Sequence, residues 1–195
     1  MASSVLVLAL GCNSTRVDAI LALGEKPIQD CTETRGTLKA GTYRVRSVDR
    51  SRCWRIGQET SIFGNLGYLI AETPECTLEG ELWSFENSDS VPGAFEVHST
   101  SHSGFSLDVQ ESSKADGTNV ITYGSHTLQN QRFYVREIEP GVYEFSPAHV
   151  MTSCISERNS TSIGESAIQI EGCVPTASAQ HWQILSDGCG GASGS

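Results

Sequence analysis

Seven cysteines are the side chains in this 195-residue chain that are best suited to metal binding, redox chemistry or cross-linking: Cys12, Cys31, Cys53, Cys76, Cys154, Cys173 and Cys189. No two of them form a C-x-x-C pair, and no histidine stands beside them at the spacing of zinc ligands. The pattern therefore favours disulfides formed in an oxidising compartment, and we expect no bound metal.

The five histidines show no catalytic pattern either, because none of them lies in a motif with a nucleophile. Residues 164–168 lack the last glycine of a nucleophile elbow, and the chain has no phosphate loop, H-E-x-x-H motif or dinucleotide fingerprint. A carboxylate pair for glycoside cleavage stays open, since 23 acidic residues are present. We expect a protein that is not an enzyme and uses no cofactor.

Net charge and hydropathy indicate which classes of partner are disfavoured and where the protein is located. A net charge of −10 disfavours nucleic acid, and no apolar run of about 18 residues exists that would insert in a membrane. Residues 5–10 are apolar and resemble a weak or truncated secretory signal, a frayed N-terminal segment being the alternative. The cysteines and the glycosylation sequons at Asn13 and Asn159 favour a secreted glycoprotein, with Asn159 in a surface turn.

The elements that position these residues form a threefold repeat. Residues 41–45 (Gly-Thr-Tyr-Arg-Val) recur at 93–97 and 141–145, at intervals of about 50 residues, with the alternation of a half-buried strand. Three further elements keep the same period. The pattern predicts twelve short strands near 41–47, 54–57, 67–71, 82–87, 93–98, 105–109, 119–123, 132–137, 141–146, 153–157, 167–171 and 181–185.

Twelve strands in three sets of four predict an all-β fold. Three blades are too few for a propeller, and a solenoid would need polar caps that the chain lacks. A closed barrel with one hairpin from each repeat removes the sheet edges and buries the aromatic residues at 83, 133 and 182 around a pseudo-threefold axis. We therefore expect a β-trefoil.

The last element of each repeat resembles the Q-x-W signature of the ricin-B-type lectin family. It reads Gln180-His181-Trp182 in the third repeat, Gln131-Arg132-Phe133 in the second and Glu81-Leu82-Trp83 in the first. The resemblance extends from about Gly41 to Leu185, and the middle repeat is most similar to the trefoil lectins of mushrooms. It implies a carbohydrate-binding protein whose partners are glycans or glycoproteins.

The resemblance also implies a disulfide within each of two repeats, Cys53–Cys76 and Cys154–Cys173. The middle repeat has Ser106 and Ser125 at the corresponding positions and should lack the bridge. Because the first and last strands of a closed barrel are neighbours, Cys31 and Cys189 form a candidate third pair.

A shallow sugar site needs fixed polar acceptors, an aromatic face and a rigid frame. The resemblance assigns these roles in the middle repeat to Asp108 as acceptor of two ring hydroxyls, Tyr123 as stacking ring and Asn130 as a further hydrogen-bonding group. Gln131 would orient Asp108, although a purely structural role for Gln131 is favoured. The sugar implied is of the galactose or N-acetylgalactosamine type, and Ile121 replaces a polar family residue.

The other two repeats are expected to be silent. Arg55 and Ser156 stand at the positions of the acceptor carboxylate, and Pro74 and Glu171 offer no ring face. We expect three segments: 1–36 with the signal-like stretch and a linker, 37–187 as the trefoil, and 188–195 as a Gly/Ser-rich tail. A trefoil protease inhibitor acting through an exposed loop is the alternative function, and a targeting module of a larger secreted enzyme or toxin is a third.

Overall fold

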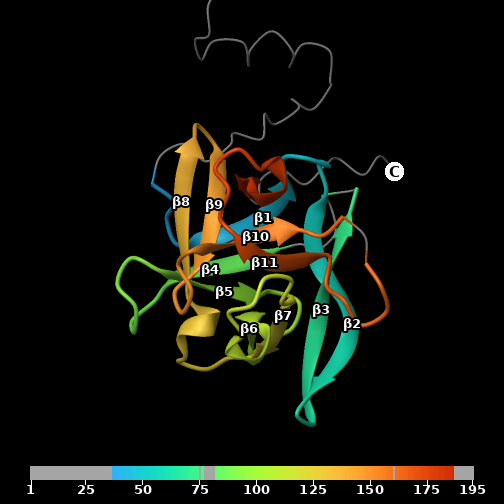
Figure 1. The fold of residues 1–195 in the computed structure, drawn as a ribbon. Coiled ribbons are helices and arrows are strands. Elements are labelled where there is room, and N and C mark those ends of the chain that lie inside the picture. Colours follow the sequence, from blue (N-terminus) through green and yellow to red (C-terminus); the bar gives the residue numbers. More distant parts are fainter. Residues whose placement is uncertain (1–36, 75, 77–81, 160, 187–195) are drawn as a thin grey trace, which may run out of the picture. The chain divides into compact units, whose positions relative to one another are not determined.

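The computed structural model describes residues 37–74, 76, 82–159 and 161–186, and this part of the chain is built from β-strands (Figure 1). Helical turns within it are three short 3-10 segments, η3 (Gln110–Ser112), η4 (Gln129–Gln131) and η5 (Ser178–Gln180), and none of its helices is suited to crossing a membrane. The strands are β1 (Gly41–Ser47), β2 (Cys53–Ile62), β3 (Asn65–Thr73), β4 (Trp83–Asn87), β5 (Phe95–Ser99), β6 (Phe105–Val109), β7 (Val120–Gly124), β8 (Phe133–Glu139), β9 (Val142–Pro147), β10 (Ser153–Glu157), β11 (Ile168–Gly172) and β12 (Trp182–Ser186).

Six of the strands close into an antiparallel ring. β1 pairs with β4, β4 with β5, β5 with β8, β8 with β9 and β9 with β12, and the pairing of β12 with β1 completes the circle. The remaining strands form one hairpin per repeat, β2–β3, β6–β7 and β10–β11. A ring of this kind leaves no open edge, and the arrangement confirms the predicted β-trefoil.

Aromatic side chains from all three repeats meet in one core. Trp83, Phe133 and Trp182, the aromatic positions of the repeated signature, are each 0% exposed. The ring of Trp54 lies 4.7 Å from that of Trp182 and 6.3 Å from that of Trp83. Trp83 Nε1 donates to the carbonyl of Trp54 and Trp182 Nε1 to that of Ile155, whereas Trp54 Nε1 is buried without a hydrogen-bond partner among the described residues. The predicted aromatic core is thus present.

Two strands begin later than the repeat predicted. The glycines at 93 and 141 were expected to open strands, yet β5 starts at Phe95 and β9 at Val142. Gly93 and Gly141 have φ values of 79° and 78°, in the left-handed region that suits glycine. These glycines therefore make the turns before the strands.

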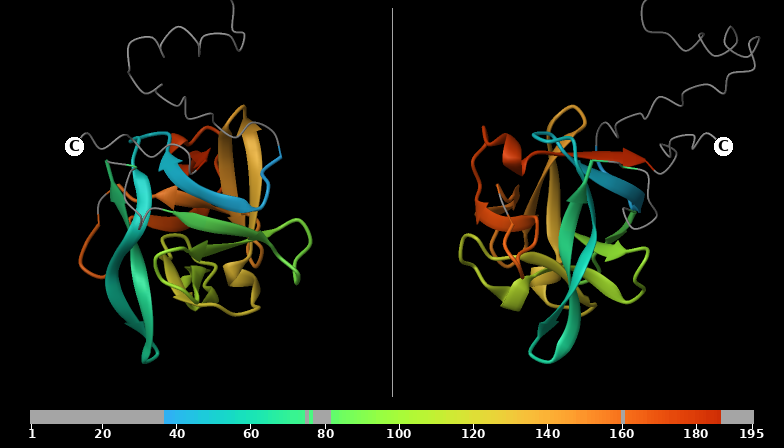
Figure 2. Two further views of the ribbon diagram at one scale, coloured as in Figure 1. Left: turned by 180° about the vertical axis from the view of Figure 1, so that it is seen from behind. Right: turned by 90° about the vertical axis from the view of Figure 1, so that its right-hand side faces the viewer.

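The first hairpin is longer than the sequence predicted. β2 and β3 have 10 and 9 residues, whereas the strands of the other two hairpins have five. Phe63 and Gly64 form its tip with φ values of 50° and 80°, both positive as in a type I′ turn. The hairpin extends well past the other two in Figures 1 and 2. Its strand β3 pairs with β7, which joins the first repeat to the middle one.

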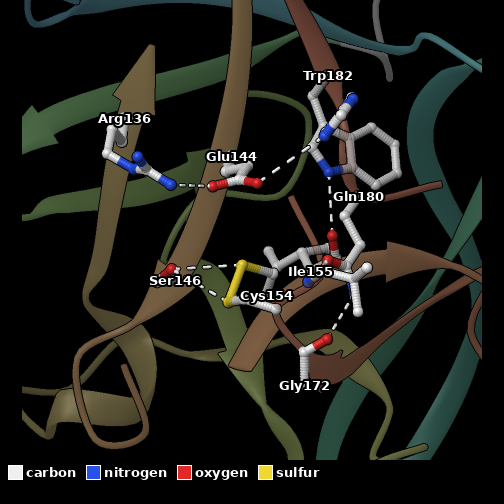
Figure 3. Close-up of a disulfide and its surroundings, with 11 residues drawn as sticks. Arg136, Glu144, Ser146, Cys154, Ile155, Gly172, Gln180 and Trp182 are labelled. Carbon is white, nitrogen blue, oxygen red and sulfur yellow. Dashed lines mark hydrogen bonds and ion pairs between the residues drawn. A yellow bond between two sulfur atoms is a disulfide. The ribbon is translucent and has the colours of Figure 1, made fainter. Parts of the chain in front are cut away.

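Two disulfides hold the hairpins of the first and third repeats, and both were predicted. Cys53 is bonded to Cys76 and Cys154 to Cys173, the second shown in Figure 3. In the middle repeat the Oγ atoms of Ser106 and Ser125 lie 2.6 Å apart, so a hydrogen bond occupies the place of the bridge. Cys31 and Cys189, like the expected segments 1–36 and 188–195, lie outside the described residues.

Candidate functional site

The middle hairpin positions Asp108 by strand alternation. Leu107 and Val109 of β6 are 0% exposed and belong to the main core, so the side chain between them points to the opposite face of the hairpin. There Asp108 is opposite Ile121 of β7. The carboxylate is nevertheless only 3% exposed, because the segment that follows β7 covers it.

Three side chains from that segment contact a single oxygen of Asp108. Asn130 Nδ2 and Gln131 Nε2 each donate to Oδ2 at 2.9 Å, and His126 Nε2 lies 3.2 Å from the same atom. The 3-10 turn η4 brings the two amides to the carboxylate side by side. No side chain or backbone group of the described residues hydrogen-bonds to Oδ1, which is the atom left for a ligand donor.

Burial gives this group of side chains unusual proton affinities. Removal from water raises the pKa of Asp108 to about 7, against the opposing effect of the hydrogen bonds from Gln131 and Asn130. Burial, together with the charge of Arg132, lowers the pKa of His126. The Nδ1 atom of His126 accepts from the backbone N–H of Leu128 at 3.3 Å, so in neutral His126 the proton is on Nε2 and faces Asp108.

The four residues predicted for this site lie together. Tyr123 is half-buried, with its ring 6.3 Å from that of His126. It packs against a small apolar cluster of Ile62, Leu69 and Ile121, to which the long first hairpin contributes two members. This packing fixes the Tyr123 ring on the same face of the hairpin as Asp108. His126 was not predicted for this site, since no spacing or motif links it to Asp108.

Gln131 has a structural role that its counterpart in the third repeat shares. Its Nε2 also donates to the carbonyl of Gly124, and its Oε1 accepts the backbone N–H of His126. Gln180 makes the same pair of bonds: its Nε2 donates to the carbonyl of Gly172 (Figure 3), and its Oε1 accepts from the N–H of Val174. The glutamine of the signature thus fastens the loop to the end of its hairpin. In the middle repeat it additionally holds Asp108.

The first and third repeats place no carboxylate at the position of Asp108. Arg55 is opposite Ala71 and is exposed, while Ser156 is opposite Gln169 and is 2% exposed. The Ser156 hydroxyl donates to the carbonyl of Glu157. Pro74 is exposed, and the described residues contain no group of three or more acidic, histidine or cysteine side chains arranged for a metal ion.

Asn159, the predicted glycan acceptor, is exposed after β10. Its side-chain oxygen lies 3.4 Å from a guanidinium nitrogen of Arg50. This exposure leaves the position open to modification.

Comparison with known proteins identifies the class. The family model described as ricin-type beta-trefoil lectin domain-like matches residues 79–170. Residues 79–170 thus resemble a ricin-type β-trefoil lectin domain, the family whose signature the repeats resemble, and the structural neighbours share the β-trefoil fold.

The individual proteins that match this chain are distant from it in sequence. Flavastacin from Elizabethkingia meningoseptica is 31% identical over 103 residues, which cover 52% of this chain but 23% of Flavastacin. The designed threefold-symmetric protein ThreeFoil superposes with a TM-score of 0.61 at 22% identity, over 74% of this chain and 98% of ThreeFoil. A lectin from Polyporus squamosus gives a TM-score of 0.59 at 15% identity, over 76% of this chain and 50% of the lectin. The structural likenesses show a shared fold.

Proposed function

We propose that this domain binds carbohydrate through one site in the middle repeat, formed by Asp108, Tyr123, Asn130 and Gln131, and that it acts by binding and not by catalysis. The observation that carries the proposal is the carboxylate of Asp108, which is fixed through Oδ2 by two amides while Oδ1 stays available. Acceptors with fixed geometry are what paired sugar hydroxyls require.

The ligand we propose is a sugar of the galactose or N-acetylgalactosamine type. Two neighbouring ring hydroxyls would donate to Asp108, and the apolar face of the sugar would pack on Tyr123. The Oδ1 atom of Asn130 is buried without a hydrogen-bond partner among the described residues, so it is a second acceptor in the same place. Structures of similar fold include a Polyporus squamosus lectin bound to a galactose-containing epitope and SeviL bound to asialo-GM1 saccharide, which supports this ligand class.

We also propose that the protein works outside the cell as a secreted glycoprotein. Two disulfides clamp the hairpins of its first and third repeats, and bonds of this kind persist in oxidising compartments. Its partners there would be glycans or glycoproteins.

The test is a glycan array followed by calorimetric titration with galactose and N-acetylgalactosamine. A single shallow site should bind in the millimolar to high micromolar range, about 4–6 kcal/mol. Asp108→Ala should abolish binding and Tyr123→Ala should weaken it by about 1–2 kcal/mol through the lost ring contact. The matched controls are Arg55→Ala and Ser156→Ala, at the corresponding positions of the other repeats, which should bind as the parent does.

Two outcomes would overturn the proposal. Undiminished binding by Asp108→Ala, with loss in either control variant, would move the site to another repeat. If the parent bound no glycan at all, inhibition of papain-like and trypsin-like proteases would be measured next, because an exposed trefoil loop can also act as an inhibitor.

A further inference from the structure

A second cavity lies away from the Asp108 site, between the first and third repeats. It has a volume of about 370 Å³, at the small end of the usual range for small-molecule sites. Its walls are the β2–β3 hairpin and the segment 158–167 that follows β10, which Figure 1 shows beside that hairpin. None of the four residues of the proposed sugar site lines it.

Buried hydrogen bonds fasten the two walls together. The backbone N–H of Ala167 donates to the carbonyl of Ile70 at 2.7 Å, and the N–H of Ile70 donates to the hydroxyl of Ser166 at 2.9 Å. Ser166 is 0% exposed and Ile70 is 1% exposed. The cavity is therefore a preformed site whose walls come from different repeats, and a ligand would pay little ordering entropy there.

A pair of carboxyl groups stands at one side of the cavity. Glu72 lines it, and Glu157 behind Glu72 is 4% exposed. Burial and the nearby Glu157 raise the pKa of Glu72 to about 8, so Glu72 holds a proton at neutral pH. The protonated carboxyl of Glu72 and the amide of Gln58, another lining residue, give the cavity groups that pair with hydroxyls.

Three arginines line the same cavity, and they differ in how they are engaged. Arg50 donates to the backbone carbonyls of Arg158 and Asn159 and lies 4.0 Å from Glu157. Arg158 donates to the carbonyl of Ser166 and is 3.5 Å from a carboxylate oxygen of Glu165. The guanidinium of Arg52, in contrast, makes no hydrogen bond or ion pair within 4 Å to any residue that the structure describes, although it attracts Glu72 through space.

With Glu72 protonated, the lining holds three guanidinium groups and one carboxylate, that of Glu165, while Glu157 lies behind Glu72. The lining of the cavity therefore carries a net positive charge, and the guanidinium of Arg52 is the cation available to pair with an anionic ligand. Its lining contains hydroxyl, amide and carboxyl groups with an aliphatic floor, but no aromatic ring. Such a lining suits a small anion that is rich in hydroxyls better than a flat aromatic ligand.

We propose that this cavity is a second ligand site, for a carboxylated sugar such as a uronic acid residue. The sugar carboxylate pairs with the guanidinium of Arg52, and its ring hydroxyls bond the Glu72 carboxyl, the Gln58 amide and the Ser162 hydroxyl. The site is independent of the one proposed in the middle repeat, since the two share no lining residue.

The experiment titrates glucuronic acid into the full chain, produced without N-glycans because Asn159 also lines the cavity. Glucose serves as the uncharged comparison. Arg52→Ala should weaken glucuronic acid binding at least tenfold, and Arg52→Lys, which keeps the charge, should recover part of it. Arg55→Ala, which removes an exposed arginine of β2 that does not line the cavity, is the matched control and should bind as the parent does.

The two proposed sites are separated by their own variants. Asp108→Ala should leave glucuronic acid binding intact, and Arg52→Ala should leave galactose binding intact. The second site is refuted if the parent does not bind glucuronic acid, binds glucose equally well, or keeps its affinity in Arg52→Ala. It is also refuted if Asp108→Ala abolishes the glucuronic acid signal, because the ligand then occupies the middle repeat. An unchanged melting temperature of Arg52→Ala shows that the fold is retained.

Discussion

Replacing Asp108 by asparagine should stabilise the folded protein at alkaline pH while it removes carbohydrate binding. The amide keeps one oxygen for the hydrogen bonds from Asn130 and Gln131, so the local geometry persists. What it loses is the negative charge of a side chain that is 3% exposed. Stability and binding thus move in opposite directions.

The magnitude follows from the pKa of Asp108, which is raised from 3.8 to about 7. A carboxyl with a raised pKa binds its proton more tightly in the folded state. Its contribution to stability is therefore complete below about pH 4 and is lost as pH rises to about 7. The full shift corresponds to about 4 kcal/mol. We expect Asp108→Asn to match the parent near pH 4 and to be more stable than the parent by up to this amount at pH 8.

The assay is urea unfolding of parent and variant across pH 4–8. Glu72 also has a raised pKa and changes stability in the same direction, but it is present in both proteins and cancels in the difference. Equal pH slopes for the two proteins would refute the reasoning, because the carboxylate would then be as well solvated in the folded state as in the unfolded one. In the parent, galactose binding should be about tenfold weaker at pH 6 than at pH 8, since only the ionised carboxylate accepts two hydroxyls.

Three further predictions concern covalent structure. The double change Ser106→Cys and Ser125→Cys, whose oxygens lie 2.6 Å apart, should form a third hairpin disulfide and raise the free energy of unfolding by about 3 kcal/mol, as chemical unfolding with and without reductant would show. Mass spectrometry of non-reduced peptides should find Cys31 bonded to Cys189, and free thiols at both positions would contradict the expected closure of the chain ends. Protein secreted from eukaryotic cells should carry an N-glycan on the exposed Asn159, and an unshifted mass after glycosidase treatment would count against this.

The repeat explains why so much of the fold was predictable. Strand alternation and the recurring aromatic at 83, 133 and 182 repeat three times, so each copy supports the interpretation of the others. The family resemblance supplied the pairings of Cys53 with Cys76 and Cys154 with Cys173. In the middle repeat serine replaces both cysteines, which is the pattern expected where the whole disulfide is missing.

Features that break the repeat were not predictable. The long first hairpin follows from its pairing with β7 and its packing on Ile121, contacts between repeats that leave no periodic signal. His126 reaches Asp108 only because the loop after β7 folds back over the hairpin. The Glu72–Glu157 pair likewise joins residues of different repeats, so nothing in the spacing of the two acids reveals it.

The pairing of β1 with β12 has a mechanical consequence. Tyr43, near the start of β1, is opposite Ser186, the last residue of β12, so the two ends of the barrel leave from the same end of one antiparallel pair. A force that pulls these ends apart opens their hydrogen bonds one after another, as a zipper does, and does not load them all together in shear. With Cys31 and Cys189 reduced, a domain tethered through both ends would therefore yield first at this seam, while the three hairpins carry none of the initial load.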